Sequence, residues 1–90
     1  MDKKDVQAVI EEITTVTELL YQENVTEGYG KLAALLRRIM SITAEITDEA
    51  EQTSFVEILN PALEAMEAQD ATLLADILQY DLIAKLEEYL

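Results

Sequence analysis

The stretch LLADILQYDL, residues 73–82, carries the helical period that decides the fold of this chain. At helical spacing, Leu74, Ile77 and Leu78 form one apolar ridge. The next place on that ridge belongs to Asp81, a carboxylate where a core residue is expected. Because a carboxylate buried alone is costly, we expect Asp81 to pair with Lys85 one turn on, to pair with Arg37 or Arg38, or to reach water.

After Asp81, charged residues continue the first ridge of this helix and the apolar residues lie on another side. Lys85 and Glu88 succeed Asp81 on the first ridge, whereas the apolar residues have moved about a third of a turn around the axis. These displaced apolar residues are Leu82, Leu86, Tyr89 and Leu90. The helix thus shows two apolar faces. We expect it either to change neighbours partway along the fold or to project its C-terminal end and bind something.

Apolar residues recur at intervals of three and four along almost the whole chain, and no window alternates strictly enough to propose a strand. The fold is therefore predicted to be all-α, with residues 1–90 forming one domain. Four helices are expected, with N-caps at Asp2, Thr26, Thr47 or Asp48, and Asp70. Gly28 and Gly30 are expected to loosen the first turn of the second helix. Pro61 lies inside the third helix and predicts a kink near residues 57–60 or a split into two shorter helices.

Four such helices with short connections favour an antiparallel up-down four-helix bundle. The alternative is a set of helical hairpins that completes its core only as a dimer. A chain of 90 residues buries a modest share of its surface, so a second chain would add stability.

The charge of the chain is unevenly distributed. Residues 1–44 carry seven acids and five bases, whereas residues 45–90 carry twelve acids and a single base, Lys85. The total of −13 disfavours binding to nucleic acid or to an anionic membrane surface. It leaves open an acidic nucleic-acid mimic that binds a basic protein. The N-terminus lacks the apolar core of a signal sequence and no apolar run is long enough to span a membrane, so we expect a cytoplasmic protein.

The chain has neither His nor Cys, which removes the side chains of most nucleophilic triads and zinc sites. We therefore expect no catalytic activity, cofactor or small-molecule substrate. One catalytic alternative remains, because helical nucleotide pyrophosphatases hold Mg²⁺ with carboxylates spaced along two facing helices. The carboxylates that could do so are Glu45, Asp48, Glu64 and Glu67. Glu64 and Glu67 lie opposite the apolar arc of their helix, which favours a solvated face.

The second predicted helix carries a stripe of small residues away from its apolar arc. This stripe comprises Gly30, Ala34, Arg37, Ser41 and Ala44, at spacings of four, three, four and three. That is the period at which two helices pack along a seam, with Arg37 as a polar anchor. The alternative is that these residues are simply exposed.

The segment ALEAMEAQDATLLADILQYDLIAKLEEYL, residues 62–90, resembles the tail of small helical proteins of Gram-positive bacteria. In those proteins an LADxLxYxL motif follows an ALEAxxxxD motif. More loosely, the long helical pair joined through an Asp is similar to flagellin-chaperone bundles. The resemblance implies an interaction module and assigns no partner.

Together these features predict a non-catalytic protein–protein interaction module, meaning an adaptor, a small chaperone or a self-associating structural protein. Its partner is expected to be another protein or a second copy of the chain. The expected contact residues are Tyr80, Asp81, Leu82, Ile83, Tyr89 and Leu90, together with Gly30, Ala34, Arg37 and Ser41. Aromatic residues and Arg are favoured in this set because they are enriched at interface centres.

Overall fold

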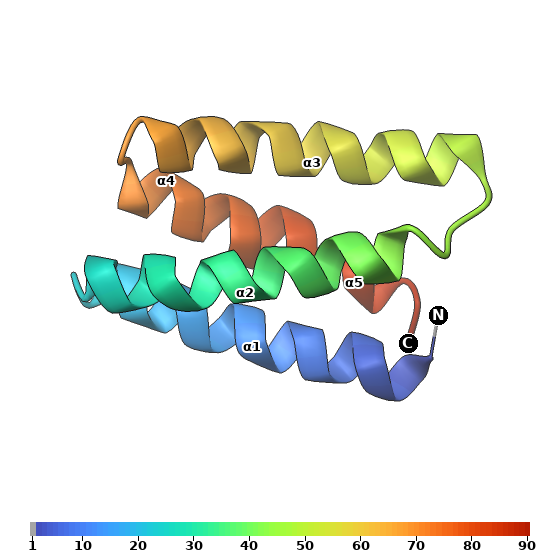
Figure 1. Ribbon diagram of the computed structural model, residues 1–90, viewed down its shortest axis with the longest axis horizontal. Coiled ribbons are helices and arrows are strands. Elements are labelled where there is room, and N and C mark those ends of the chain that lie inside the picture. Colours follow the sequence, from blue (N-terminus) through green and yellow to red (C-terminus); the bar gives the residue numbers. More distant parts are fainter. Residues whose placement is uncertain (1) are drawn as a thin grey trace.

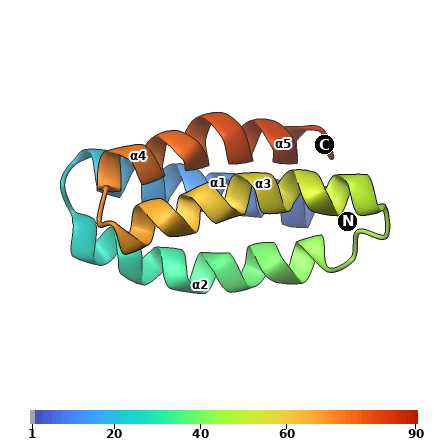
Figure 2. The same ribbon diagram turned by 90° about the horizontal axis from the view of Figure 1, so that it is seen from above.

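The computed structural model describes residues 2–90, which form an all-α four-helix bundle with extents of 36 × 24 × 19 Å (Figures 1 and 2). The helices are α1 (Lys3–Tyr21), α2 (Val25–Thr43), α3 (Glu49–Glu67), α4 (Ala71–Asp76), the π-helical segment η1 (Ile77–Leu82) and α5 (Ile83–Glu87). The last three follow one another without a break and make the fourth rod of the bundle. Successive rods run in opposite directions, which confirms the predicted up-down architecture.

Aspartate side chains start three of the four rods. The Asp2 carboxylate accepts a hydrogen bond from the backbone N–H of Lys4 at 2.9 Å, and Asp48 and Asp70 make equivalent bonds at the starts of α3 and α4. These caps confirm the predicted starts. The second start was predicted two residues too late: Thr26 was expected as the N-cap, whereas the N-cap is Asn24 and α2 begins at Val25.

Two of the helices end on a residue in the left-handed conformation. Gln69 has φ of 58°, its N–H bonds the carbonyl of Met66 at 3.1 Å, and the N–H of Asp70 bonds the carbonyl of Ala65 at 2.9 Å. This pair of bonds is a Schellman ending, and the turn at Glu23, with φ of 64°, repeats it at the end of α1. The ending reverses the chain at once, so a new helix starts within two residues.

Gly28 brings α1 and α2 together. It lies buried in the first turn of α2, and a Cβ added there would lie 2.9 Å from Cδ2 of Leu20. The glycine therefore permits close approach of the two helices. Its predicted role in loosening the turn is corrected, because the residue is helical and its φ is negative.

The core lies along the inner sides of all four rods. Its fully or nearly fully buried apolar residues are Val6, Val9, Ile13, Val16, Leu20, Leu32, Leu35, Ile39, Phe55, Ala62, Ala65, Leu74, Ala75, Ile77, Leu78, Leu82 and Leu86. Met40 and Leu63 fall within the apolar arcs of α2 and α3, yet they are 64% and 39% exposed. Both lie on the sides of α2 and α3 that face each other, where the bundle is open.

The opening arises because α2 and α3 are the one neighbouring pair that packs loosely. Helix α1 packs against α2 and against the α4–η1–α5 rod, and α3 packs against α4 and η1. Three of the four pairs of neighbouring rods therefore pack closely, and the fourth pair, α2 and α3, leaves apolar side chains exposed between them.

The π-helical segment resolves the two apolar faces predicted for the last helix. Leu74, Leu78, Leu82 and Leu86 recur every four residues and are all fully buried. In a regular α-helix a step of four residues passes a full turn by about 40°, so three steps drift by about a third of a turn. π-Helical winding, with i→i+5 bonds, places more residues in each turn and cancels this drift. The rod therefore presents one apolar face, and the expected change of face at Asp81 is wrong.

Pro61 does not divide α3, which continues as one helix from Glu49 to Glu67. A proline in a helix leaves the carbonyl four residues earlier without its donor, in this case that of Glu57. Because Glu57 and Pro61 both lie on the exposed side, water can satisfy that carbonyl. The expected split into two helices is therefore wrong.

Replacing Gln69 with glycine should stabilise the bundle. Gln69→Gly removes the Cβ that opposes a positive φ, so the free energy of unfolding should rise by about 0.5–1 kcal/mol in urea denaturation. Gln69→Ala keeps the Cβ and should give no such gain. An equal change in the two variants would contradict the left-handed turn.

Truncating Leu82 should be far more damaging than truncating its exposed neighbour Tyr80. Leu82→Ala should lower the free energy of unfolding by about 2–5 kcal/mol, because it leaves a cavity in the core. Tyr80→Ala should change it by about 0.5 kcal/mol or less, because Tyr80 is 66% exposed. Small and equal losses would place Leu82 on the surface.

Candidate functional site

The contact residues predicted near the C-terminus do not share one surface. Tyr80 and Leu90 are exposed, as a contact surface requires, whereas Ile83 and Tyr89 are half-buried and pack against the core. Leu82 is fully buried, so it belongs to the bundle's own core and its predicted contact role is corrected. The reason is the π-helical winding, which turns Leu82 inward.

Asp81 is exposed and makes no hydrogen bond or ion pair within residues 2–90. Two of its predicted partners are engaged elsewhere: Lys85 bonds Glu51 at 2.6 Å, and Arg38 pairs with Glu12. Arg37, the third, is exposed on α2. Asp81 therefore faces solvent, which was one of the predicted alternatives.

The stripe of small residues on α2 is exposed along its whole length, from Gly30 through Ala34, Arg37 and Ser41 to Ala44. A Cβ added at Gly30 would meet nothing within 4 Å. No helix in the described part of the chain therefore packs on this stripe.

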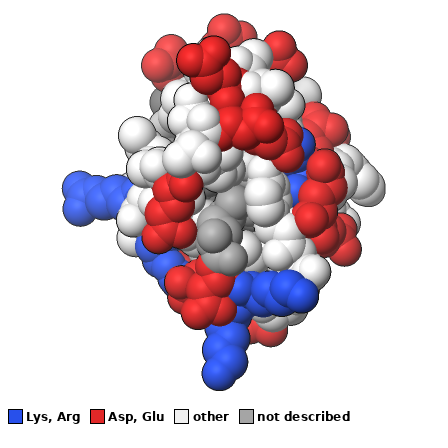
Figure 3. Space-filling model, turned by 90° about the vertical axis from the view of Figure 1, so that its right-hand side faces the viewer, with Lys and Arg blue, Asp and Glu red and all other residues white. Residues whose placement is uncertain are grey.

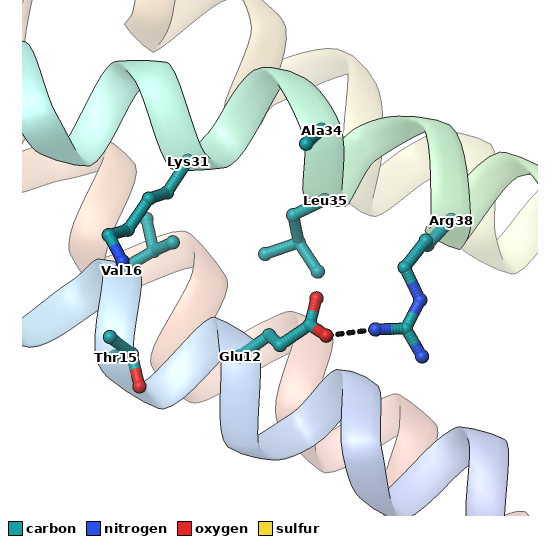
Figure 4. Close-up of a pocket in the computed structure, with 7 residues that line it drawn as sticks. All are labelled: Glu12, Thr15, Val16, Lys31, Ala34, Leu35 and Arg38. Carbon is teal, nitrogen blue, oxygen red and sulfur yellow. Dashed lines mark hydrogen bonds and ion pairs between the residues drawn. The ribbon is translucent and has the colours of Figure 1, made fainter.

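Ala34 also lines a cleft between α1 and α2 of about 440 Å³ (Figure 4). In Figure 4, Arg38 turns toward Glu12 and Lys31 bends toward Val16. The Arg38–Glu12 ion pair is about half exposed on both sides, so it contributes at most about 1 kcal/mol. The buried floor of Val16 and Leu35 is small and the rim is charged, which makes this cleft a poor apolar contact surface.

The four carboxylates of the magnesium alternative do not converge. Asp48 caps the start of α3 and Glu64 lies 16 residues further along the same helix, about 24 Å away. Glu45 lies just beyond α2, near Asp48, and Glu67 lies at the far end of α3. Residues 2–90 contain no group of three or more acidic side chains able to hold a metal ion. The magnesium alternative needs these four carboxylates to face one another across two helices, and the described residues do not place them in that way.

A polar cluster that the sequence did not indicate joins α3 to the C-terminal end of the last rod. Glu51 accepts hydrogen bonds from Nζ of Lys85 at 2.6 Å and from the hydroxyl of Tyr89 at 2.8 Å. The Tyr89 ring lies 5.9 Å from the Phe55 ring, centroid to centroid. Glu51 and Lys85 are 34 residues apart, so no helical spacing could have paired them.

These bonds shift the pKa values of the cluster in a consistent way. The hydrogen bond from Lys85, and then that from Tyr89, lower the pKa of Glu51. The bond to Glu51 raises the pKa of Lys85. The pKa of Tyr89 is raised first by desolvation and then by the Glu51 carboxylate. The cluster is a structural tie between α3 and α5.

A second polar tie connects α1 to the fourth rod beside Tyr80. The Tyr21 hydroxyl donates to the Asp76 carboxylate at 2.5 Å, and this bond raises the pKa of Tyr21 to about 12. The two tyrosines line a groove of about 630 Å³ between α1 and η1, and Ile83 lines it with them. Two of the predicted contact residues, Tyr80 and Ile83, therefore line the same groove. The rest of its lining is polar and consists of Thr14, Thr17, Glu18 and Gln79.

The most apolar opening of the bundle lies between α2 and α3. A groove of about 350 Å³ is lined there by Met40, Thr43, Ala44, Gln52, Phe55, Val56 and Leu59. Leu36 and Leu63 meet further along the same side, over a closely packed floor. We call these nine residues the α2–α3 groove. None of them is charged, and Met40, Val56 and Leu63 expose 64%, 50% and 39% of their surface.

The sequence pattern hid this groove because Met40 and Leu63 fall within the apolar arcs of their helices, a position that is typical of core residues. Val56, beside Phe55, widens the apolar arc of α3 toward α2, and this was the one available signal of an apolar surface.

The two walls of the groove belong to helices of opposite charge. Helix α2 carries Lys31, Arg37, Arg38 and one acid, Glu27, for a net charge of +2. Helix α3 carries Glu49, Glu51, Glu57, Glu64 and Glu67, for a net charge of −5. In Figure 3, which looks at the end of the bundle bearing the termini, most of the Lys and Arg surface lies at the left and bottom and most of the Asp and Glu surface at the top and right.

Fold and surface together define an acidic four-helix bundle with one open, apolar edge. The chain belongs to the family described as Domain of unknown function (DUF8042), which it matches over residues 3–90. No curated protein and no solved structure matches it significantly. None of the helices within residues 2–90 has the length and apolar character needed to cross a membrane.

Glu51→Gln should destabilise the bundle in a pH-dependent way. A carboxylate whose pKa is lowered on folding stabilises the folded state above its unfolded pKa, about 4.5, and loses that contribution as the pH falls through the folded pKa. Wild type should therefore be more stable than the variant at pH 7, and the difference should shrink below about pH 4.5 in thermal unfolding.

Glu64→Gln is the matched control, because Glu64 is exposed on the same helix and has no partner within the described chain. It should show no comparable loss at pH 7. A Glu51→Gln effect that stayed constant from pH 7 to pH 3 would contradict the ion pair.

Proposed function

We propose that this protein is a protein–protein interaction module and that the α2–α3 groove is its contact surface. The observation that carries the proposal is the exposure of three large apolar side chains, Met40, Val56 and Leu63, along a groove without charged residues. Contiguous exposed apolar surface with a polar rim is typical of protein-binding sites. Adaptor, small-chaperone and self-associating roles in the cytoplasm all fit this kind of surface.

The proposal differs from the sequence-based expectation in the residues that make the contact. Leu82 is buried, and Ile83 and Tyr89 are half-buried, so the contact residues expected near the C-terminus offer little exposed apolar surface. Tyr80 remains as an exposed aromatic on the opposite groove. Arg37 keeps its expected role as a polar anchor, because it lies at the α2 rim within one turn of Met40.

The acidic-mimic alternative rests on the twelve acids of residues 45–90. It predicts binding to a basic protein that weakens steeply with salt, because exposed charges are screened. Binding through the α2–α3 groove is apolar and should persist at high salt. Salt dependence therefore separates the two functions.

A charge placed in the groove should abolish partner binding. In Met40→Glu/Val56→Glu both substitutions fall at exposed positions, so the variant should keep its helical circular dichroism. Light scattering and affinity capture from the host lysate should show that it loses the self-association or the captured proteins that wild type has. Each buried charge should cost a factor of at least about 10 in affinity.

Gln7→Glu/Ala84→Glu is the matched control, since it adds the same two charges at exposed positions on α1 and α5. It should behave as wild type. A wild-type protein that neither self-associates nor captures any protein in a groove-dependent way would refute the interaction module.

A further inference from the structure

We infer that the occupant of the α2–α3 groove is the same groove of a second copy of this chain, related by a two-fold axis parallel to the helices. In this dimer α2 of each copy lies over α3 of the other. The inference rests on the proposed function and names its partner. It is argued from the shape, size and charge of the groove.

The apolar surface of the groove is suited to pack against itself. It has raised side chains on both walls, Met40 on α2 and Val56 and Leu63 on α3, beside a hollow of about 350 Å³. A two-fold contact uses the same patch on both copies, and an axis parallel to the helices places Met40 of each copy over Val56 of the other, beside the two facing hollows. Two such copies would cover the large apolar side chains that a single bundle leaves exposed on this side.

The open face is large enough for a stable dimer. Helices α2 and α3 each have 19 residues. Each is therefore about 28 Å long, and two helices side by side span about 20 Å. The flat footprint is about 560 Å² per copy before side-chain relief is counted, or about 1,100 Å² for both, above the roughly 1,000 Å² expected of a biological interface.

The charges of α2 and α3 favour one of the two possible orientations of the two-fold axis. With the axis parallel to the helices, α2 at +2 lies over α3 of the other copy at −5. With the axis across the helices, α3 lies over α3, and five acids face five acids. Like charges across an interface are costly, so the parallel axis is favoured.

Arg37 marks the point where the two copies make their polar contact. It lies at the rim of the groove one turn before Met40, it is exposed, and it has no partner within residues 2–90. Because α2 and α3 are antiparallel, this level of α2 corresponds to about Asn60 on α3. Glu57 and Glu64 flank that level and are exposed. In the proposed dimer Arg37 of each copy lies between these two carboxylates of the other.

The acidic fourth rod does not oppose this arrangement. Figure 2 places α4 and α5 on the side of the bundle farthest from α2, so the proposed contact keeps them apart. The charge of −13 on each copy still repels the other through solvent. At 0.15 M salt this repulsion is screened beyond about 8 Å, and the test belongs at that salt or above.

Sedimentation or light scattering at 0.15 M salt should give a mass twice the 10.1 kDa of the chain. Met40→Glu/Val56→Glu should raise the dimer dissociation constant by a factor of about 100 or more, whereas Gln7→Glu/Ala84→Glu should leave it unchanged. Circular dichroism confirms that each variant is folded. A dimer that survives the groove variant would overturn the inference.

Charge exchange tests the orientation of the two copies. Arg37→Glu and Glu64→Arg should each weaken the dimer, by a factor of about 3–10, and the double variant should recover most of the loss. A groove-dependent dimer without this recovery would overturn the parallel axis.

A monomer at all concentrations would overturn the dimer and leave the interaction module standing only if wild type captures another protein that the groove variant loses. Failure of the dimer and failure of the proposed function are thus distinguishable.

Discussion

The four-residue period of Leu74, Leu78, Leu82 and Leu86 is the constraint on which the rest of the structure depends. A regular α-helix would carry these leucines about a third of a turn around its axis, and Leu86 would then leave the core. The π-helical segment Ile77–Leu82 keeps all four buried, so that the rod packs against α1 on one side and α3 on the other. Because α1 and α3 meet the same rod, the bundle is held together through its last helix.

This arrangement explains why one edge of the bundle is open. Both α2 and α3 are attached through other elements, α2 through α1 and α3 through the fourth rod, and they pack only loosely on each other. Met40 and Leu63, which lie between them, are therefore exposed although both fall on the apolar arcs of their helices. The polar ties, Glu51 to Lys85 and Tyr89, and Tyr21 to Asp76, all lie on the packed sides and hold the rod in register with α1 and α3. Within residues 2–90 no comparable side-chain bond joins α2 directly to α3, and this agrees with the contact surface proposed for the open edge.

Much of the architecture was predictable from local chemistry. The helical period, the aspartates at positions 2, 48 and 70, and the short connections predicted four antiparallel helices because each signal acts within one or two turns. The candidate site was much less predictable. The small-residue stripe is exposed, which was one of the two alternatives. Leu82, however, was expected to contact a partner and is fully buried, whereas Met40 and Leu63 lie on apolar arcs and are exposed. Periodicity identifies which face of a helix is apolar, whereas the number of neighbours covering that face depends on the whole bundle.

The sequence by itself therefore determined that the chain is all-α, where three of its four helical rods start and how its charge divides between the two halves. Those properties follow from hydrogen-bond capping, residue spacing and composition, none of which needs a distant contact. Only the tertiary structure decided the winding of residues 77–82, the pairing of Glu51 with Lys85 across 34 residues, and the exposure of the α2–α3 groove. Each of these depends on how separate helices pack together, and their packing is a balance of burial over the whole core that no local pattern records.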